Sequence, residues 1–263
     1  MHLKANSNLA DSSADNIPAI LLVGGKGTRL QAVLSSKPKP LANVGNVPFL
    51  ELLVMQLRSQ GIRRMIMSTG YLAEQIEDIF GDGRRWEADI QYARESRPLG
   101  TAGAVKFAAS LLKTDSDFLI VNGDSFTELD VPRFIRFHRE HGGLVSMAVC
   151  RVPNAARYGA VHLDGEKHIT GFSEKTGKQQ PGLINAGVYL FGRAILDRIP
   201  QGFCNLEKDV FPKLVEQGMF AFEGQGMFID IGTPEDYARA QTLCEKLRQA
   251  ARPQLESSKL LNS

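Results

Sequence analysis

A short apolar run that leads directly into a glycine-rich loop constrains this chain more than any other feature. Residues 19–23 (AILLV) are apolar, and residues 24–30 read GGKGTRL. An apolar run ended by glycine is typical of a parallel strand covered on both faces. The loop's glycines can expose backbone N–H groups to an anion, and its lysine and arginine add positive charge. The residues concerned are Gly24, Gly25, Gly27, Lys26 and Arg29.

The stretch therefore predicts a buried strand that opens into a phosphate cradle, although a turn without a ligand explains the loop alone equally well. Two better-known glycine loops do not fit. The dinucleotide fingerprint requires a glycine where this chain has Leu30, and the Walker loop requires Ser or Thr after its lysine, where Lys26 precedes Gly27. The first mismatch excludes a dinucleotide-dependent oxidoreductase.

A lysine-proline repeat follows at residues 37–41 (KPKPL). Proline fixes its own φ and favours an extended conformation in the residue before it. We therefore expect a stiff strip that directs Lys37 and Lys39 outward.

Composition limits the class of protein. The 263 residues fit one α/β domain, which we expect over residues 17–250 between a disordered leader (1–16) and a polar tail (251–263). Three cysteines without CxxC spacing indicate reduced thiols in a cytoplasmic protein. A net charge of +2 with no basic block argues against nucleic acid as a partner, and no apolar run is long enough for a membrane span.

Strand and helix patterns alternate along the first half of the chain. This alternation predicts a Rossmann-like α/β fold, with a mostly parallel sheet, helices on both faces and ligands beyond the carboxyl ends of the strands. Beyond residue 144 strand patterns dominate, and a hairpin of residues 160–163 and 169–173 is expected to cap one side of the cleft. We also expect a helix over 206–216 and a final strand over 227–231.

Two aspartates stand at predicted strand ends. Asp124 follows the apolar run 118–121, and Asp230 lies within the segment 228–231 (FIDI). A carboxylate among apolar residues costs several kcal/mol unless it is paired or binds a metal. Each aspartate alone is explained by a solvent-facing or helix-capping role. As a pair beside a phosphate cradle, they suit Mg²⁺, which binds one or two carboxylates and completes its shell with phosphate oxygens and water.

Taken together, these motifs resemble the signature of the sugar-1-phosphate nucleotidyltransferases, in which G-G-x-G-T-R-L precedes P-K-P. Where the family carries Pro-Leu-Thr after its Arg-Leu pair, this chain has QAVLSS at residues 31–36. The family's G-D, Y-G, E-K, N-A-G and D-I-G motifs recur in the family's order over residues 17–247. The resemblance implies the nucleotide-diphospho-sugar transferase fold and the joining of a sugar 1-phosphate to a nucleoside triphosphate, with release of pyrophosphate.

The resemblance also implies roles for individual residues. The residues expected to make catalytic contacts to phosphates are Arg29, Lys39 and Lys175, and those expected to bind the metal are Asp124 and Asp230. The residues expected to contact the nucleotide are Gly24, Gly25, Gly27, Thr28, Pro98, Gly100 and Thr101. The residues expected to contact the sugar are Tyr158, Gly159, Glu174 and Asn185. Ordinary structural roles remain open for several of these residues: packing for Tyr158, a surface ion pair for Glu174 and Lys175, a turn for Asn185 and a helix N-cap for Thr101.

Glu95 bears on the choice of base. Thymidine- and uridine-using relatives tend to carry glutamine at this position. Guanine offers two adjacent donors, N1–H and the 2-amino group, and one carboxylate accepts both. Uracil and thymine instead place a carbonyl oxygen against the carboxylate. Glu95 therefore predicts GTP, while a surface ion pair with Arg94 or Arg97 is the alternative.

Smaller details at residues 71–74, 80–83 and 228–232 resemble the heptose 1-phosphate guanylyltransferases, which supply GDP-heptose for bacterial surface polysaccharides. Mannose guanylyltransferases and glucose uridylyl- or thymidylyltransferases are close competitors. A nucleotide-sugar-sensing regulatory subunit of the same fold is a rival from another class. The enzyme is favoured because all five expected metal and phosphate residues are present, namely Arg29, Lys39, Asp124, Lys175 and Asp230. The sequence leaves open whether the chain forms a homo-oligomer.

Overall fold

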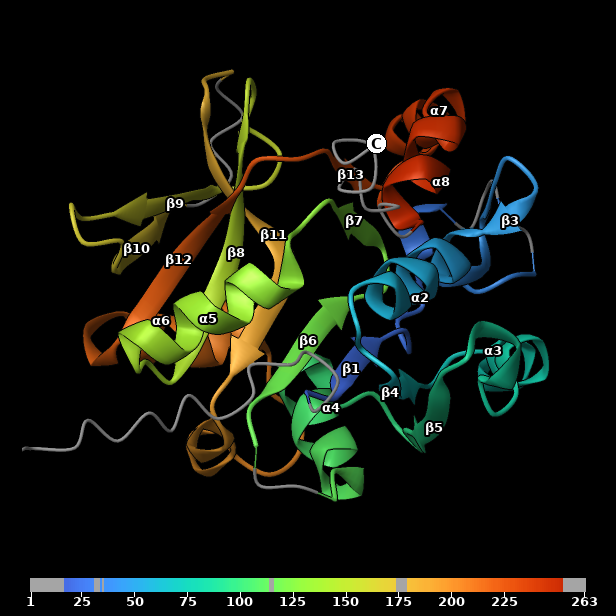
Figure 1. Cartoon of the computed structure of the whole chain (residues 1–263), viewed down its shortest axis with the longest axis horizontal. Coiled ribbons are helices and arrows are strands. Elements are labelled where there is room, and N and C mark those ends of the chain that lie inside the picture. Colours follow the sequence, from blue (N-terminus) through green and yellow to red (C-terminus); the bar gives the residue numbers. More distant parts are fainter. Residues whose placement is uncertain (1–16, 31–33, 35, 114–115, 174–178, 253–263) are drawn as a thin grey trace, which may run out of the picture.

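The computed structural model describes residues 17–30, 34, 36–113, 116–173 and 179–252. Its centre is a seven-stranded sheet in the order β12-β8-β11-β6-β1-β4-β5 (Figure 1). Only β11 runs antiparallel to its neighbours, and the other neighbouring pairs are parallel. The strands are β1 (Ala19–Leu22), β4 (Arg64–Thr69), β5 (Asp89–Arg94), β6 (Phe118–Asn122), β8 (Val145–Val152), β11 (Gly182–Phe191) and β12 (Met219–Gly224). The predicted mostly parallel α/β sheet is confirmed.

Both faces of the sheet are buried, which explains why β1 is apolar at every position. Ala19 and Leu21 face one hydrophobic core, whereas Ile20 faces the other. The first core includes residues of α2 (Phe49–Ser59), α3 (Ala73–Phe80), α5 (Val131–His141) and α8 (Cys244–Ala251). The second core includes residues of α4 (Gly100–Ala108) and α6 (Phe211–Leu214). Successive strand side chains alternate between these two layers.

Three two-stranded sheets accompany the main sheet in the part of the chain that the structure describes. The predicted hairpin forms from β9 (Ala160–Leu163) and β10 (Ile169–Ser173). The other pairs are β2 (Asn43–Val44) with β3 (Val47–Pro48), and β7 (Ser125–Thr127) with β13 (Phe228–Asp230). In the described part of the chain, no helix has the length and apolar character needed to cross a bilayer.

The structure confirms one expectation about the C-terminal third and refines another. The predicted final strand over 227–231 is confirmed as β13, which pairs with β7 outside the main sheet, whereas the edge strand β12 before it was not predicted. The predicted helix over 206–216 is helical along its whole length, but it changes type. A π-helical turn over Leu206–Val210 leads into the short α6, and a 3₁₀ turn over Val215–Gln217 follows. Pro212 has no N–H group to donate to the preceding turn, so a single α-helix cannot run through this segment.

Candidate active site

Two adjoining cavities lie beyond the carboxyl ends of β1 and β6. The larger has a volume of about 660 Å³ and the smaller about 320 Å³. Both are lined by Arg29, Lys39, Asp124 and Gly232. These four residues therefore mark the junction of the two cavities.

The predicted phosphate cradle lines the larger cavity. All six of its predicted residues are there, namely Gly24, Gly25, Lys26, Gly27, Thr28 and Arg29. The loop is tied to the next strand–helix connection because Tyr71 donates its backbone N–H to the Gly24 carbonyl over 3.2 Å. Gly27 has a φ of +58°, and a Cβ at this position would lie 2.7 Å from Cβ of Lys39. A glycine is thus required where the loop passes over the Lys39 side chain.

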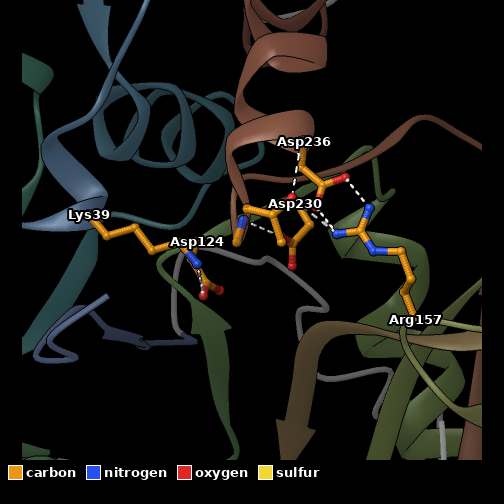
Figure 2. Close-up of polar contacts among 7 residues, drawn as sticks. Lys39, Asp124, Arg157, Asp230 and Asp236 are labelled. Carbon is orange, nitrogen blue, oxygen red and sulfur yellow. Dashed lines mark hydrogen bonds and ion pairs between the residues drawn. The ribbon is translucent and has the colours of Figure 1, made fainter. Parts of the chain in front are cut away.

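Lys39 points inward, contrary to expectation. The segment Lys39–Leu41 forms a 3₁₀ turn with Pro40 near its start, and this turn replaces the predicted extended strip. Lys37 is exposed, whereas Lys39 is only 9% exposed and its Nζ donates to Oδ2 of Asp124 over 2.7 Å (Figure 2). A buried ammonium needs such a carboxylate partner, and this pairing accounts for the inward direction.

Asp124 and Asp230 come together through the small sheet of β7 and β13. Asp230 pairs in register with Ser125, and Ile231 donates its N–H to the Asp124 carbonyl over 3.0 Å. Burial raises the pKa of Asp230, and the neighbouring charge of Asp124 raises it further, while Lys39 acts in the opposite direction. The two carboxylates therefore repel one another across the cavity junction (Figure 2).

This donor set fits a divalent cation. Two repelling carboxylates are the oxygen ligands that Mg²⁺ takes from a protein when phosphates and water supply the rest of its shell. Among the described residues, no group of three or more His, Cys, Asp or Glu side chains forms a separate metal cluster. The pair at the junction is thus the candidate metal site.

Glu95 also lines the larger cavity, and it follows directly after β5. Its Oε1 accepts a hydrogen bond from the Ser68 hydroxyl over 3.1 Å, and its Oε2 accepts one from the Leu99 N–H over 3.0 Å. Burial raises the pKa of Glu95 above its ordinary value. The alternative of an ion pair with Arg94 is not realised, because Arg94 pairs with Glu74.

Pro98, Gly100 and Thr101 line the larger cavity beside Glu95. Thr101 is not the N-cap of α4, which begins at Gly100 after Leu99 without a side-chain cap. Its hydroxyl instead accepts from the Leu206 N–H over 2.8 Å and donates to Glu207 over 3.3 Å. Thr101 therefore ties the entry of α4 to the irregular segment that follows residue 205.

The predicted sugar-side residues separate into three groups. Tyr158 lines the smaller cavity, and its ring packs edge-on against Phe228 at a centroid distance of 5.6 Å. Burial raises the pKa of Tyr158 to about 12, with further contributions from Asp236 and Asp230.

Gly159 and Asn185 do not line either cavity in the described part of the chain. The Asn185 amide is engaged within β11, where its Nδ2 donates to the Tyr189 hydroxyl over 2.7 Å and its Oδ1 accepts from the Gly187 N–H over 2.9 Å. Glu174 and Lys175 lie outside the described residues. Their predicted roles stay predictions.

Several lining residues were not anticipated. They are Ser68, Asn122, Phe203, Asn205, Arg157 and Gly232. Arg157 directly precedes the Y-G motif and Gly232 ends D-I-G, so their positions beside motifs could have identified them. Phe203 is 69% exposed at the larger cavity, and nothing in its local sequence distinguishes it from a core aromatic.

Comparison with known proteins gives a consistent result. The nucleotidyl transferase family matches residues 18–246. A mannose-1-phosphate guanylyltransferase of Mycobacterium tuberculosis is 37% identical over 227 residues, covering 85% of this chain and 63% of the mycobacterial protein. A D-glycero-alpha-D-manno-heptose 1-phosphate guanylyltransferase of Aneurinibacillus thermoaerophilus is 37% identical over 226 residues, covering 85% and 96%. The crystal structure of HddC from Yersinia pseudotuberculosis complexed with GMP-PN matches with a TM-score of 0.78 and 34% identity, covering 86% of this chain and 98% of HddC.

Proposed function

This chain belongs to the nucleotidyl transferase family, and from that premise we propose that it transfers a guanylyl group from GTP to a sugar 1-phosphate and releases pyrophosphate. One observation carries the proposal: two cavities meet at Arg29, Lys39 and Asp124, so that two phosphorylated substrates can react where these charges converge. The guanylyltransferases among the relatives support the same reaction class.

For the sugar we propose D-glycero-D-manno-heptose 1-phosphate, with the product serving the synthesis of surface polysaccharide. The heptose enzyme of Aneurinibacillus supports this choice. Mannose 1-phosphate is the second candidate, because the mycobacterial mannose enzyme is equally similar at 37% identity. Selection between the two depends on hydroxyl contacts.

In the proposed reaction an oxygen of the sugar phosphate attacks the α-phosphorus of GTP. The new O–P bond forms as the bond to the departing pyrophosphate breaks, and no general base is needed because the attacking phosphate is already ionised. Positioning and charge neutralisation are then the main tasks of the protein. The backbone of the Gly24 loop and Arg29 would bind the departing phosphates. Lys39 and, by family resemblance, Lys175 would screen the reacting ones.

Asp124 and Asp230 would hold Mg²⁺. When bound, the ion supplies positive charge that is shared with the phosphate oxygens. Lys39 forms an ion pair with Asp124 and so holds this carboxylate at the junction of the two cavities. Its positive charge also reduces the repulsion between Asp124 and Asp230. The oxygen donors and their position beside the phosphate cradle support this assignment.

A substrate panel tests the proposed function. We would combine heptose, mannose and glucose 1-phosphates with each of the four nucleoside triphosphates and measure pyrophosphate release in Mg²⁺. The expected result is turnover with GTP and the heptose substrate, with higher kcat/KM than any other pair. Absence of turnover in every combination would instead support a regulatory subunit of the same fold, and preference for mannose 1-phosphate would overturn the heptose assignment alone.

A further inference from the structure

Arg157 occupies the smaller cavity and has no role in the reaction as described so far. It lies between β8 and β9, next to Tyr158, and lines this cavity together with Arg29 and Lys39. Its guanidinium reaches across to α7 (Pro234–Thr242), where it forms a forked ion pair with Asp236 (Figure 2). This contact joins two segments that are far apart in the sequence.

The fork fixes the orientation of the guanidinium. Nη1 donates to Oδ1 of Asp236 over 3.1 Å, Nη2 donates to Oδ2 of Asp236, and Nη2 also donates to the Thr233 hydroxyl over 3.2 Å. Asp236 is itself held, because its Oδ2 accepts from the Thr233 hydroxyl over 2.9 Å. An arginine carries five N–H donors, so these contacts leave donors that can bind a ligand.

Burial is unequal across the ion pair. The Asp236 side chain is 9% exposed, whereas the Arg157 side chain is 48% exposed. The buried carboxylate needs the arginine as its partner. The arginine, in contrast, is about half exposed and lines the cavity, which a purely structural tether does not require.

The charges around the cavity indicate which ligand would occupy it. Asp230 lies between the Lys39–Asp124 pair and the Arg157–Asp236 pair in the close-up view (Figure 2). Lys39 and Arg157 are each paired with an aspartate, and Arg29 adds a positive charge to the lining that offsets the charge of Asp230. Asp236 and Thr233 occupy the fork of Arg157, so its Nε and one Nη1 N–H group remain to donate to a ligand. The charge of the guanidinium favours a phosphate oxygen over a neutral sugar hydroxyl as the acceptor.

We propose that Arg157, oriented by Asp236, binds a phosphate group in the smaller cavity. The inference rests on the proposed function and extends it, because this phosphate belongs either to the sugar 1-phosphate or to the departing pyrophosphate. Arg157 would then be a binding residue and Asp236 a positioning residue.

The test compares Arg157→Ala, Arg157→Lys and Asp236→Asn with the parent. Arg151→Ala is the matched control. Arg151 lies near the carboxyl end of β8, forms an ion pair with Glu223 over 3.1 Å, is 62% exposed and lines neither cavity. KM would be measured for the sugar 1-phosphate and GTP in the forward direction and for pyrophosphate in the reverse direction, together with Tm.

We expect Arg157→Ala to raise one phosphate KM at least tenfold. The KM for GTP should stay within twofold if the site binds the sugar 1-phosphate, and it should rise together with the KM for pyrophosphate if the site binds the leaving group, which is the β,γ-diphosphate of GTP. A raised KM for sugar 1-phosphate assigns the site to that substrate, and a raised KM for pyrophosphate assigns it to the leaving group. Arg157→Lys should raise the same KM by a smaller factor than Arg157→Ala, since a lysine ammonium keeps the positive charge but lacks the planar guanidinium. Asp236→Asn should also raise this KM, by a smaller factor than Arg157→Ala.

If the Arg157 variants lower Tm but leave every KM at the values of Arg151→Ala, the pair is only a tether and the inference is overturned. If the parent itself shows no turnover, the proposed function fails separately. Calorimetric titration with pyrophosphate and with mannose 1-phosphate, in Mg²⁺, then decides the inference: tenfold weaker binding of either probe to Arg157→Ala supports it, and equal binding of both contradicts it.

Discussion

Glu95 is anchored by the protein, yet each of its carboxylate oxygens can accept another hydrogen bond. Ser68 and Leu99 each donate to a different oxygen. A carboxylate oxygen has two acceptor positions, so one remains on each side of the group for a ligand. This arrangement is compatible with the predicted contact to the N1–H and 2-amino donors of guanine. It also holds the carboxylate against the Pro98–Thr101 loop.

Glu95→Gln should therefore reduce the preference for GTP over UTP at least tenfold in kcat/KM, about 1.4 kcal/mol of discrimination. The physical reason is that an amide presents one acceptor and one donor, whereas guanine requires two acceptors. Because burial raises the pKa of Glu95, the parent should also lose preference for GTP as the pH falls, starting at a higher pH than an ordinary glutamate would. An unchanged GTP-to-UTP ratio in the variant would assign Glu95 to loop anchoring alone.

The aspartate pair leads to a second prediction at this scale. Asp124→Asn and Asp230→Asn should each lower pyrophosphate release at saturating Mg²⁺ by about a hundredfold or more, comparable with the loss of one preorganised electrostatic partner. Asp82→Asn serves as the control, because Asp82 pairs with Arg84 on an exposed turn. Near-parent turnover in either site variant would refute the metal assignment. Thermal unfolding would show whether Lys39 tolerates the loss of its partner.

Among the elements, the short 3₁₀ turn at Lys39–Leu41 and the glycine loop above it act as one unit. Gly27 is the contact point, with a positive φ and no room for a Cβ against Lys39. Gly27→Ala should displace the Lys39 side chain from Asp124, lower kcat/KM at least tenfold and lower Tm, since strain of this kind costs about 1–3 kcal/mol.

Gly165→Ala is a suitable comparison for Gly27→Ala. A Cβ at Gly165 meets nothing within 4 Å, and the position carries no positive φ. Kinetics and thermal unfolding of both variants would be measured side by side. Equal behaviour of the two would show that the loop does not depend on its contact with Lys39.

On the scale of the whole molecule, His138 links stability to pH. It lies on α5, is 3% exposed and shares a hydrogen bond of 2.8 Å between its Nδ1 and the Ser146 hydroxyl on β8. Burial lowers its pKa below the ordinary value of 6.5; Asp117 opposes this shift and Arg139 adds to it. The folded protein therefore holds the ring neutral at a pH where the unfolded chain already binds a proton.

As pH falls below about 6.5, the unfolded state takes up a proton that the folded state does not, so the free energy of unfolding should decrease down to the lowered folded pKa. The slope contributed by one histidine is at most about 1.4 kcal/mol per pH unit. His138→Gln should remove this contribution, whereas His141→Gln should keep it. Urea unfolding between pH 5 and 8 provides the measurement, and an unaltered slope in His138→Gln would contradict the assignment.

Local patterns in the sequence determined the central strands, the glycine loop and the strand-end positions of the two aspartates. These features depend on short-range properties: an apolar run needs two covering layers, and a backbone cradle needs glycine. Tertiary structure alone decided that β13 pairs with β7 and brings Asp230 to Asp124, that Lys39 turns inward, and that Arg157 reaches Asp236. Spacing along the chain cannot specify these partners, because the partner of a buried charge depends on which distant segments the fold packs together.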